Sequence, residues 1–143
     1  KINFEYFVLL QPTTPFRIAD EVNYLIRDMI SNKFESGFGV TRSWLHPSEH
    51  FYLNKKKVIL DKKFDNNRQK FKTFYFISGA IYMCSTKFFL KNKKFINKNS
   101  KAYLLSDLSM IDIDEPFHLE IAKSLFQNKK NLNKFKIKFQ RLN

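Results

Sequence analysis

The stretch Leu9-Leu10-Gln11-Pro12-Thr13-Thr14-Pro15-Phe16-Arg17 decides how this chain folds. It closes an apolar run that begins at Tyr6, and a strand must stop there because proline fixes φ and donates no ladder hydrogen bond. A helical pattern begins within a few residues, so the segment reads as a strand, a rigid polar turn and a helix. Ligands of open α/β sheets bind beyond the carboxyl ends of strands, where Gln11 lies, although a stiff connector without a ligand fits the stretch equally well.

Hydrophobic spacing on both sides of this turn predicts alternating strands and helices. The clearest helix spans residues 18–32, where one apolar stripe recurs at helical spacing. The nearly continuous apolar run at 6–10 is typical of a strand covered on both faces, as in a parallel sheet. The stripe consists of Val22, Leu25, Ile26, Met29 and Ile30. Further strands are expected at 37–44, 73–85 (one strand or a pair), 103–105 and 110–113, a hairpin at 51–60, a helical turn at 86–90 and a helix at 116–126.

The amino-acid composition is typical of a globular protein but does not identify a binding partner. The 143 residues are enough for one domain with a real core, and 17% of them are aromatic. The formal net charge of +13 favours anionic partners through long-range attraction. The joint abundance of Lys, Asn, Phe and Ile is also what an AT-rich coding sequence produces, so the charge by itself identifies no ligand.

Cys84 is the only cysteine, so no internal disulfide can form. Its apolar surroundings predict a packed thiol rather than a nucleophile. The longest apolar stretch, 74–84, falls short of the roughly 20 residues that span a bilayer, and the first residues do not resemble a signal peptide. We therefore expect a protein of the reducing cytoplasm with no membrane span.

Two acidic residues and two histidines are spaced as metal ligands often are. Asp112 and Asp114 are two apart, so on an extended segment they share a face and suit a hard cation such as Mg²⁺. Capping of the following helix is the other interpretation, and it fits Asp114 well. His46 and His50 could hold a metal on a helix, but Pro47 between them favours a loop.

Four motifs of this chain, taken in order, resemble those of the acylneuraminate cytidylyltransferases, the CMP-sialic acid synthetases. The opening stretch resembles LLQPTSPLR, Arg68-Gln69 resembles the RQ motif, residues 78–82 (SGAIY) resemble NGAIY, and residues 111–114 resemble the SIDID segment. Four matches at family-like intervals form a specific signal over residues 5–126. The family's N-terminal third, with its nucleotide loop, has no counterpart in these residues, and we expect a fold that is incomplete at the N-terminus.

The resemblance implies an α/β, Rossmann-like nucleotidyltransferase fold of the glycosyltransferase-A-like kind. Its three layers would comprise a mostly parallel mixed sheet with helices on both faces. Residues 1–127 would form the C-terminal two-thirds of a cytidylyltransferase domain. Residues 128–143 would form a basic tail, either solvated or serving as an anion- or partner-binding arm.

The reaction that the resemblance implies is transfer of CMP from CTP to a sialic-acid-type, nine-carbon nonulosonic acid, with release of pyrophosphate. The family's role in lipopolysaccharide or capsule biosynthesis, its homodimeric state and its Mg²⁺ or Mn²⁺ cofactor are carried over as expectations. Asp112 and Asp114 match its catalytic, metal-binding aspartates, and Arg68 would face the sugar carboxylate. The positions that match substrate-binding residues or motifs are Gln11, Arg68, Gln69, Ser78 and Tyr82.

Departures from the family pattern bear on the identity of the sugar more than on the reaction class. Ser78 replaces an asparagine, Phe76 stands where some members have arginine, and Glu115 and His118 replace a threonine and an aspartate. Legionaminic acid and related sugars share most of this chemistry.

Two alternative functions remain, a basic nucleic-acid-binding α/β module and a degenerate, non-catalytic remnant. We expect no specific nucleic acid partner, so any binding of duplex DNA should be non-specific and should collapse as salt rises. We also expect these 143 residues alone to show no CTP-dependent activity.

Overall fold

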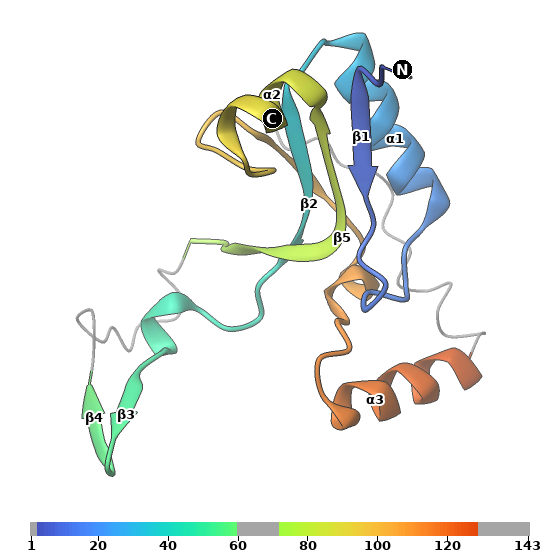
Figure 1. Cartoon of the computed structure of the whole chain (residues 1–143). Helices are drawn as coiled ribbons and strands as arrows, with labels where there is room; N and C mark the ends of the chain where they lie inside the picture. The colour runs from blue at the N-terminus through green and yellow to red at the C-terminus, as the bar shows by residue number, and fades with distance from the viewer. Residues whose placement is uncertain (1–2, 60–71, 129–143) are drawn as a thin grey trace. The chain divides into compact units, whose positions relative to one another are not determined.

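A computed structural model describes residues 3–59 and 72–128 of the chain (Figure 1). It divides into two compact units, one formed by Lys1–Thr41 with Ile77–Asn143 and the other by Arg42–Phe76. Helices and strands are interspersed along the chain, so the expected α/β class is confirmed.

The first unit is built on a mixed four-stranded sheet with the order β1-β5-β2-β6. Edge strand β1 runs antiparallel to β5, with Leu9 opposite Tyr82, whereas β2 and β6 are parallel, with Gly37 opposite Lys101. The sheet therefore has an antiparallel pair of strands at one edge and a parallel pair at the other. The strands are β1 (Tyr6–Leu9), β2 (Ser36–Arg42), β5 (Tyr75–Ser85) and β6 (Lys101–Leu104).

The expectation that the first strand is covered on both faces holds for only half of β1. Tyr6 packs against the core cluster and Phe7 packs on the other face, whereas Val8 and Leu9 keep 37% and 40% of their surface exposed. Strand β1 also pairs only with β5 among the described strands and lies at the edge of the sheet.

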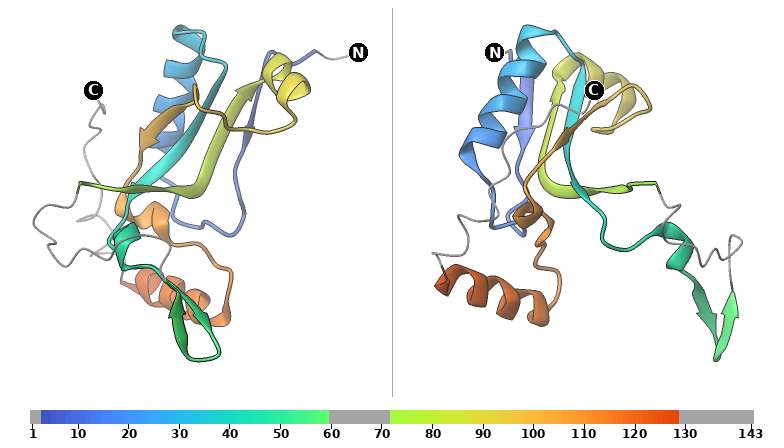
Figure 2. Two further views of the ribbon diagram at one scale, coloured as in Figure 1. Left: turned by 90° about the vertical axis from the view of Figure 1, so that its left-hand side faces the viewer. Right: turned by 180° about the vertical axis from the view of Figure 1, so that it is seen from behind.

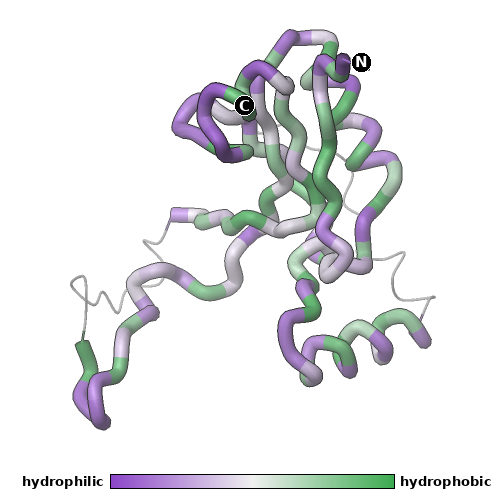
Figure 3. The backbone as a smooth tube through the Cα atoms, in the orientation of Figure 1, coloured by the Kyte–Doolittle hydropathy of each residue, from purple (hydrophilic) through white to green (hydrophobic). Residues whose placement is uncertain are grey.

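Helix α1 (Ala19–Ser31) covers one face of this sheet (Figures 1 and 2). Leu25 and Met29 are fully buried and join a core cluster with Ile81 and Met83 of β5. The predicted stripe is correct at its centre but not at its end, where Ile30 is 53% exposed. Hydrophobic and hydrophilic positions alternate along α1, as helical periodicity requires (Figure 3).

The opposite face of the sheet carries α2 (Thr86–Asn92). The Ser85 hydroxyl caps this helix by accepting from Phe88 N at 3.1 Å. The ring of Phe7 in β1 packs edge-on against Phe89 and Phe95, at centroid distances of 5.2 and 5.4 Å. Helical segments therefore pack on both sides of the sheet at β1.

The strand predicted at 110–113 is wrong. A 3₁₀ helix spans Asp107–Met110, and Ile111 N continues the turn by donating to Leu108 O at 3.2 Å. Further on, Ile113 N donates 2.8 Å to Thr13 O, so the backbone there pairs with the proline turn rather than with a strand. Helix α3 (Pro116–Gln127) then begins with proline at its first position, as predicted.

Cys84 is fully buried in β5, and this burial raises the pKa of its thiol to about 11. The prediction of a packed thiol is confirmed. Because the thiolate is the reactive form, we expect native protein at pH 8 to react with Ellman's reagent roughly a hundredfold or more slowly than unfolded protein. Absorbance of the released thiolate measures both rates, with the same sample in guanidinium chloride as the control. Equal rates would contradict a packed thiol.

The second unit contains the predicted hairpin, formed by β3 (Tyr52–Asn54) and β4 (Lys57–Ile59). These strands are antiparallel and form a sheet of their own, as the sequence suggested. Lys55 and Lys56 make the turn with φ of 51° and 85°, the left-handed region that tight hairpins use.

A 3₁₀ helix, Pro47–Glu49, lies between the two histidines of the second unit. His46 Nδ1 lies 2.6 Å from the Ser48 hydroxyl, and His50 Nδ1 lies 2.9 Å from His46 O. Within residues 3–59 and 72–128, no three His, Cys, Asp or Glu side chains gather as a metal site would require. The segment is a short 3₁₀ turn rather than the α-helix on which two histidines four apart would share a face.

None of the helices in the described ranges combines the length and the apolar character needed to cross a bilayer.

Candidate active site

The proline turn at the end of β1 is held in shape by its own arginine. Arg17 Nη1 donates to Gln11 O at 2.5 Å and to Thr14 O at 2.6 Å, and Thr14 N closes the turn onto Gln11 O at 3.3 Å. A guanidinium that bonds two carbonyls adds rigidity to a backbone that two prolines already restrict. Arg17 therefore shapes the turn, a role that the sequence did not indicate.

Gln11 lies directly against the backbone of β5. Gly79 has a φ of 74° there, and a Cβ at this position would collide with Gln11 Oε1 and lie 3.2 Å from Thr14 Oγ1. Glycine is needed for both the left-handed backbone and the close approach. The motif around Gln11 and the motif around Gly79 therefore meet in space.

The hydroxyl of Ser78 is used inside the protein. Ser78 is buried, and its Oγ accepts from Ala80 N at 3.3 Å. A Cβ on Gly39 of β2 would lie 3.1 Å from the same oxygen. Its substrate-binding role stays a prediction, but the hydroxyl supports the strand interior in this structure.

Tyr82 and Asp112 lie within electrostatic reach of each other. Burial raises the pKa of the Tyr82 phenol, and the negative charge of Asp112 raises it further. The phenol therefore remains a hydrogen-bond donor at neutral pH. Since Tyr82 pairs with Leu9 and Ile113 N bonds Thr13 O, the aspartate segment, the SGAIY strand and the proline turn lie together.

The two aspartates differ in their surroundings. Asp112 is half-buried, and its Oδ1 is buried without a hydrogen-bond partner, whereas Asp114 is exposed. A buried carboxylate oxygen without a partner is costly, and a bound cation would satisfy it. No third acidic, histidine or cysteine side chain completes a cluster in the described residues. Two carboxylates with the remaining positions left to phosphate and water suit Mg²⁺.

His118, rather than Asp114, caps helix α3. The cap residue is Glu115, and His118 Nδ1 accepts from the backbone N–H groups of Asp114 and Glu115, each at 3.3 Å. The interpretation of Asp114 as a cap is therefore wrong. Its carboxylate takes part in none of the hydrogen bonds among the described residues, which leaves it available to a cation.

Replacing His118 with alanine should destabilise the protein by about 1 kcal/mol, because two helix-terminal amides lose their acceptor. His118→Asp should recover most of this loss, since aspartate also accepts from such amides. Lys123→Ala is a matched control on α3, where an exposed ion pair with Glu120 at 2.7 Å contributes little. Urea denaturation measures all three variants. Equal stability of His118→Ala and the unmodified protein would contradict the capping role.

Arg68 and Gln69, predicted to bind substrate, lie outside the described residues, and so does the predicted basic tail beyond residue 128.

Glu21 is a residue of this region that the sequence did not single out. It lies in the first turn of α1, yet it is 4% exposed, and its Oε1 accepts from Ser106 N at 2.8 Å. Burial raises the pKa of this carboxyl, while the amide and hydroxyl of Ser106 lower it. Glu21 lies four residues before Leu25, so it is on the same face of the helix as the buried stripe. This spacing is the feature of the sequence that could have indicated its burial.

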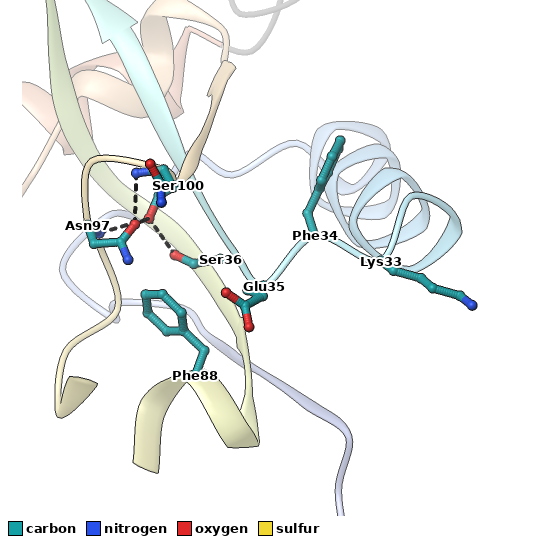
Figure 4. A pocket seen from close by; sticks show the side chains of 8 residues that line it. Lys33, Phe34, Glu35, Ser36, Phe88, Asn97 and Ser100 are labelled. Carbon is teal, nitrogen blue, oxygen red and sulfur yellow. Dashed lines mark hydrogen bonds between the residues drawn. The ribbon is translucent and has the colours of Figure 1, made fainter. Parts of the chain in front are cut away.

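A hollow of about 220 Å³ lies at the amino end of β2 (Figure 4). Its polar groups bond one another, with Ser36 Oγ 2.8 Å from Ser100 Oγ and Asn97 N donating to Ser100 Oγ at 2.8 Å. Ligands of α/β sheets bind at the carboxyl ends of strands, so this hollow is not the candidate site. Its lining is Lys33, Phe34, Glu35, Ser36, Phe88, Asn97, Asn99 and Ser100.

No family model matches the sequence. Over 138 residues the chain is 28% identical to the N-acylneuraminate cytidylyltransferase of Escherichia coli O18:K1:H7 (strain RS218 / NMEC). The aligned region covers 92% of this chain and 32% of that protein. Over 130 residues it is 27% identical to the CMP-N,N'-diacetyllegionaminic acid synthase of Legionella pneumophila subsp. pneumophila (strain Philadelphia 1 / ATCC 33152 / DSM 7513). The aligned region covers 87% of this chain and 55% of that protein. The chain thus spans only part of the length of both relatives. The resemblance identified from the motifs is confirmed.

Proposed function

We propose that this chain forms the sugar- and metal-binding part of a cytidylyltransferase that transfers CMP from CTP to a sialic-acid-type nonulosonic acid and releases pyrophosphate. The observation that carries this proposal is the meeting of three matched motifs in one unit. Gln11 lies against Gly79, and Asp112 lies near Tyr82 with a buried oxygen that has no partner. The Rossmann-like, three-layer nucleotidyltransferase fold belongs to this proposal, and helices on both faces of the sheet support it.

The class of sugar follows from the names of the two relatives. One is an N-acylneuraminate cytidylyltransferase and the other a CMP-N,N'-diacetyllegionaminic acid synthase. Their identities to this chain, 28% and 27%, do not favour either sugar. The substrate proposed for the full-length protein is therefore a nonulosonic acid without further specification, together with CTP.

Asp112 and Asp114 would hold Mg²⁺ or Mn²⁺ in this proposal. When bound, the cation neutralises charge on the nucleotide phosphates. Asp112 contributes a buried, unpartnered oxygen, and Asp114, two residues further along the chain, contributes an exposed carboxylate. The turn and strand supply the sugar contacts. The Gln11 amide offers a donor and an acceptor from a rigid backbone, and the Tyr82 phenol offers a donor.

A homodimer is the proposed assembly, and the hairpin of the second unit supports it. Its apolar side chains are mostly in water, and an exposed apolar patch often marks an interaction surface. Light scattering coupled to size exclusion should give twice the mass of one protomer. The Leu53→Glu variant should give the mass of a single protomer. A monomeric unmodified protein would contradict this assembly. The exposed hairpin side chains are Tyr52, Leu53, Val58 and Ile59.

The function is tested with the full-length gene product. Purified protein is incubated with CTP, Mg²⁺ and, separately, N-acetylneuraminic acid, N,N'-diacetyllegionaminic acid or an aldose as control. We expect pyrophosphate release and a CMP-sugar only with nonulosonic acids, with EDTA stopping the reaction. Failure of both nonulosonic acids to release pyrophosphate would count against the proposal, as would release that does not require a sugar acid.

A further inference from the structure

Glu21 is a buried carboxyl that the proposed reaction does not use. One of its oxygens accepts from Ser106 N at 2.8 Å, and the other, Oε2, is buried with no hydrogen-bond partner. The Ser106 hydroxyl lies close to the carboxyl and lowers its pKa. A carboxyl at 4% exposure is poorly explained by stability alone, because a buried ionisable group tends to cost free energy.

The bond from Glu21 fixes one end of the segment that leads to the aspartates. Ser106 precedes the 3₁₀ helix Asp107–Met110, and its carbonyl accepts from Ser109 N at 3.0 Å. The other end of the segment is fixed where Ile113 N donates to Thr13 O at 2.8 Å. Both anchors come from one stretch, the proline turn and the first turn of α1.

Asp112 lies between these two anchors, next to the second one. A carboxylate that binds a cation must be held in place, and groups behind the ligand commonly supply that order. The Thr13 anchor is a backbone carbonyl and does not depend on a side chain. The Glu21 anchor does depend on a side chain, because Ser106 N donates to the Glu21 carboxylate at 2.8 Å.

We propose that Glu21 is a positioning residue that orders the segment 106–113 and thereby sets the affinity of Asp112 and Asp114 for a divalent cation. The proposal rests on the proposed function for the identity of the metal-binding aspartates. Its physical content is a cation affinity, which can be measured without substrate or turnover.

The test uses Glu21→Met and Glu21→Gln in the full-length protein, with Asp20→Asn as the matched control. Asp20 is the neighbouring acid in the same helical turn and is exposed. Methionine has a similar size but cannot accept from Ser106 N, whereas the amide oxygen of glutamine can. Mn²⁺ affinity is measured by calorimetry well below the melting temperature of each variant, and exchange of the Ser106 amide is followed by NMR.

We expect Glu21→Met to lower Mn²⁺ affinity roughly tenfold, as loss of a group behind a metal ligand commonly does, and to speed exchange of the Ser106 amide. Glu21→Gln should retain most of the affinity, and Asp20→Asn should match the unmodified protein. If Glu21→Met does not fold, Glu21→Asp replaces it, because the shorter side chain pulls the acceptor away from Ser106 N and should also weaken binding.

Unchanged Mn²⁺ affinity in a folded Glu21→Met or Glu21→Asp protein would overturn the proposal and leave Glu21 a purely structural residue. Absence of Mn²⁺ binding in the unmodified protein would overturn it too. Failure of the proposed function looks different, because Mn²⁺ would bind and respond to Glu21 while no nonulosonic acid would be activated.

Discussion

Replacing Asp112 with asparagine is expected to lower kcat of the full-length protein about a hundredfold or more while the fold persists. The substitution keeps size and hydrogen-bonding capacity but removes the charge that a cation on the phosphates requires, so the loss falls on the chemical step. The buried Oδ1 without a partner makes this position the more sensitive of the two aspartates. Steady-state kinetics against Mg²⁺ concentration measures the effect, and thermal melts check the fold.

Asp114→Asn should cost less, and added Mg²⁺ should partly restore its activity, because an exposed ligand contributes mainly to occupancy. His118 accepts the cap amides, so Asp114→Asn should leave the melting temperature unchanged. Near-normal turnover of both variants at low Mg²⁺ would show that the aspartates do not hold the metal.

Replacing Gly79 with alanine is expected to destabilise the protein by about 2–4 kcal/mol and to raise KM for the sugar acid. The φ of 74° is unfavourable for any residue with a Cβ, and the added methyl would collide with Gln11 Oε1. Urea denaturation gives the stability, and initial rates at varied sugar concentration give KM.

The matched control for this variant is a double-mutant cycle with Gln11→Ala. Removing the Gln11 side chain should recover the part of the loss that is due to the collision and leave the part that is due to the backbone angle. Strictly additive effects of the two substitutions would mean that Gln11 does not lie against Gly79. A fully stable Gly79→Ala would refute the strained backbone as well.

The amino-acid sequence by itself determined the local elements of this protein. Pro12 and Pro15 end β1 through covalent geometry, the spacing of Leu25 and Met29 produces α1, and Pro116 starts α3. Each of these signals acts within a few residues, so it can be read without knowing the fold. The four motifs also sufficed to identify the family that the chain resembles.

Only the tertiary structure decided which distant groups meet. It placed β1 at the edge of the described sheet, ended the 3₁₀ helix Asp107–Met110 where a strand was expected and paired Ile113 with the proline turn instead, and set Gln11 against Gly79. It also buried Glu21 against Ser106, a partner 85 residues away in sequence that no local pattern indicates. Burial and hydrogen-bond partners depend on such long-range contacts, whereas periodicity and proline encode only the conformation of the chain around them.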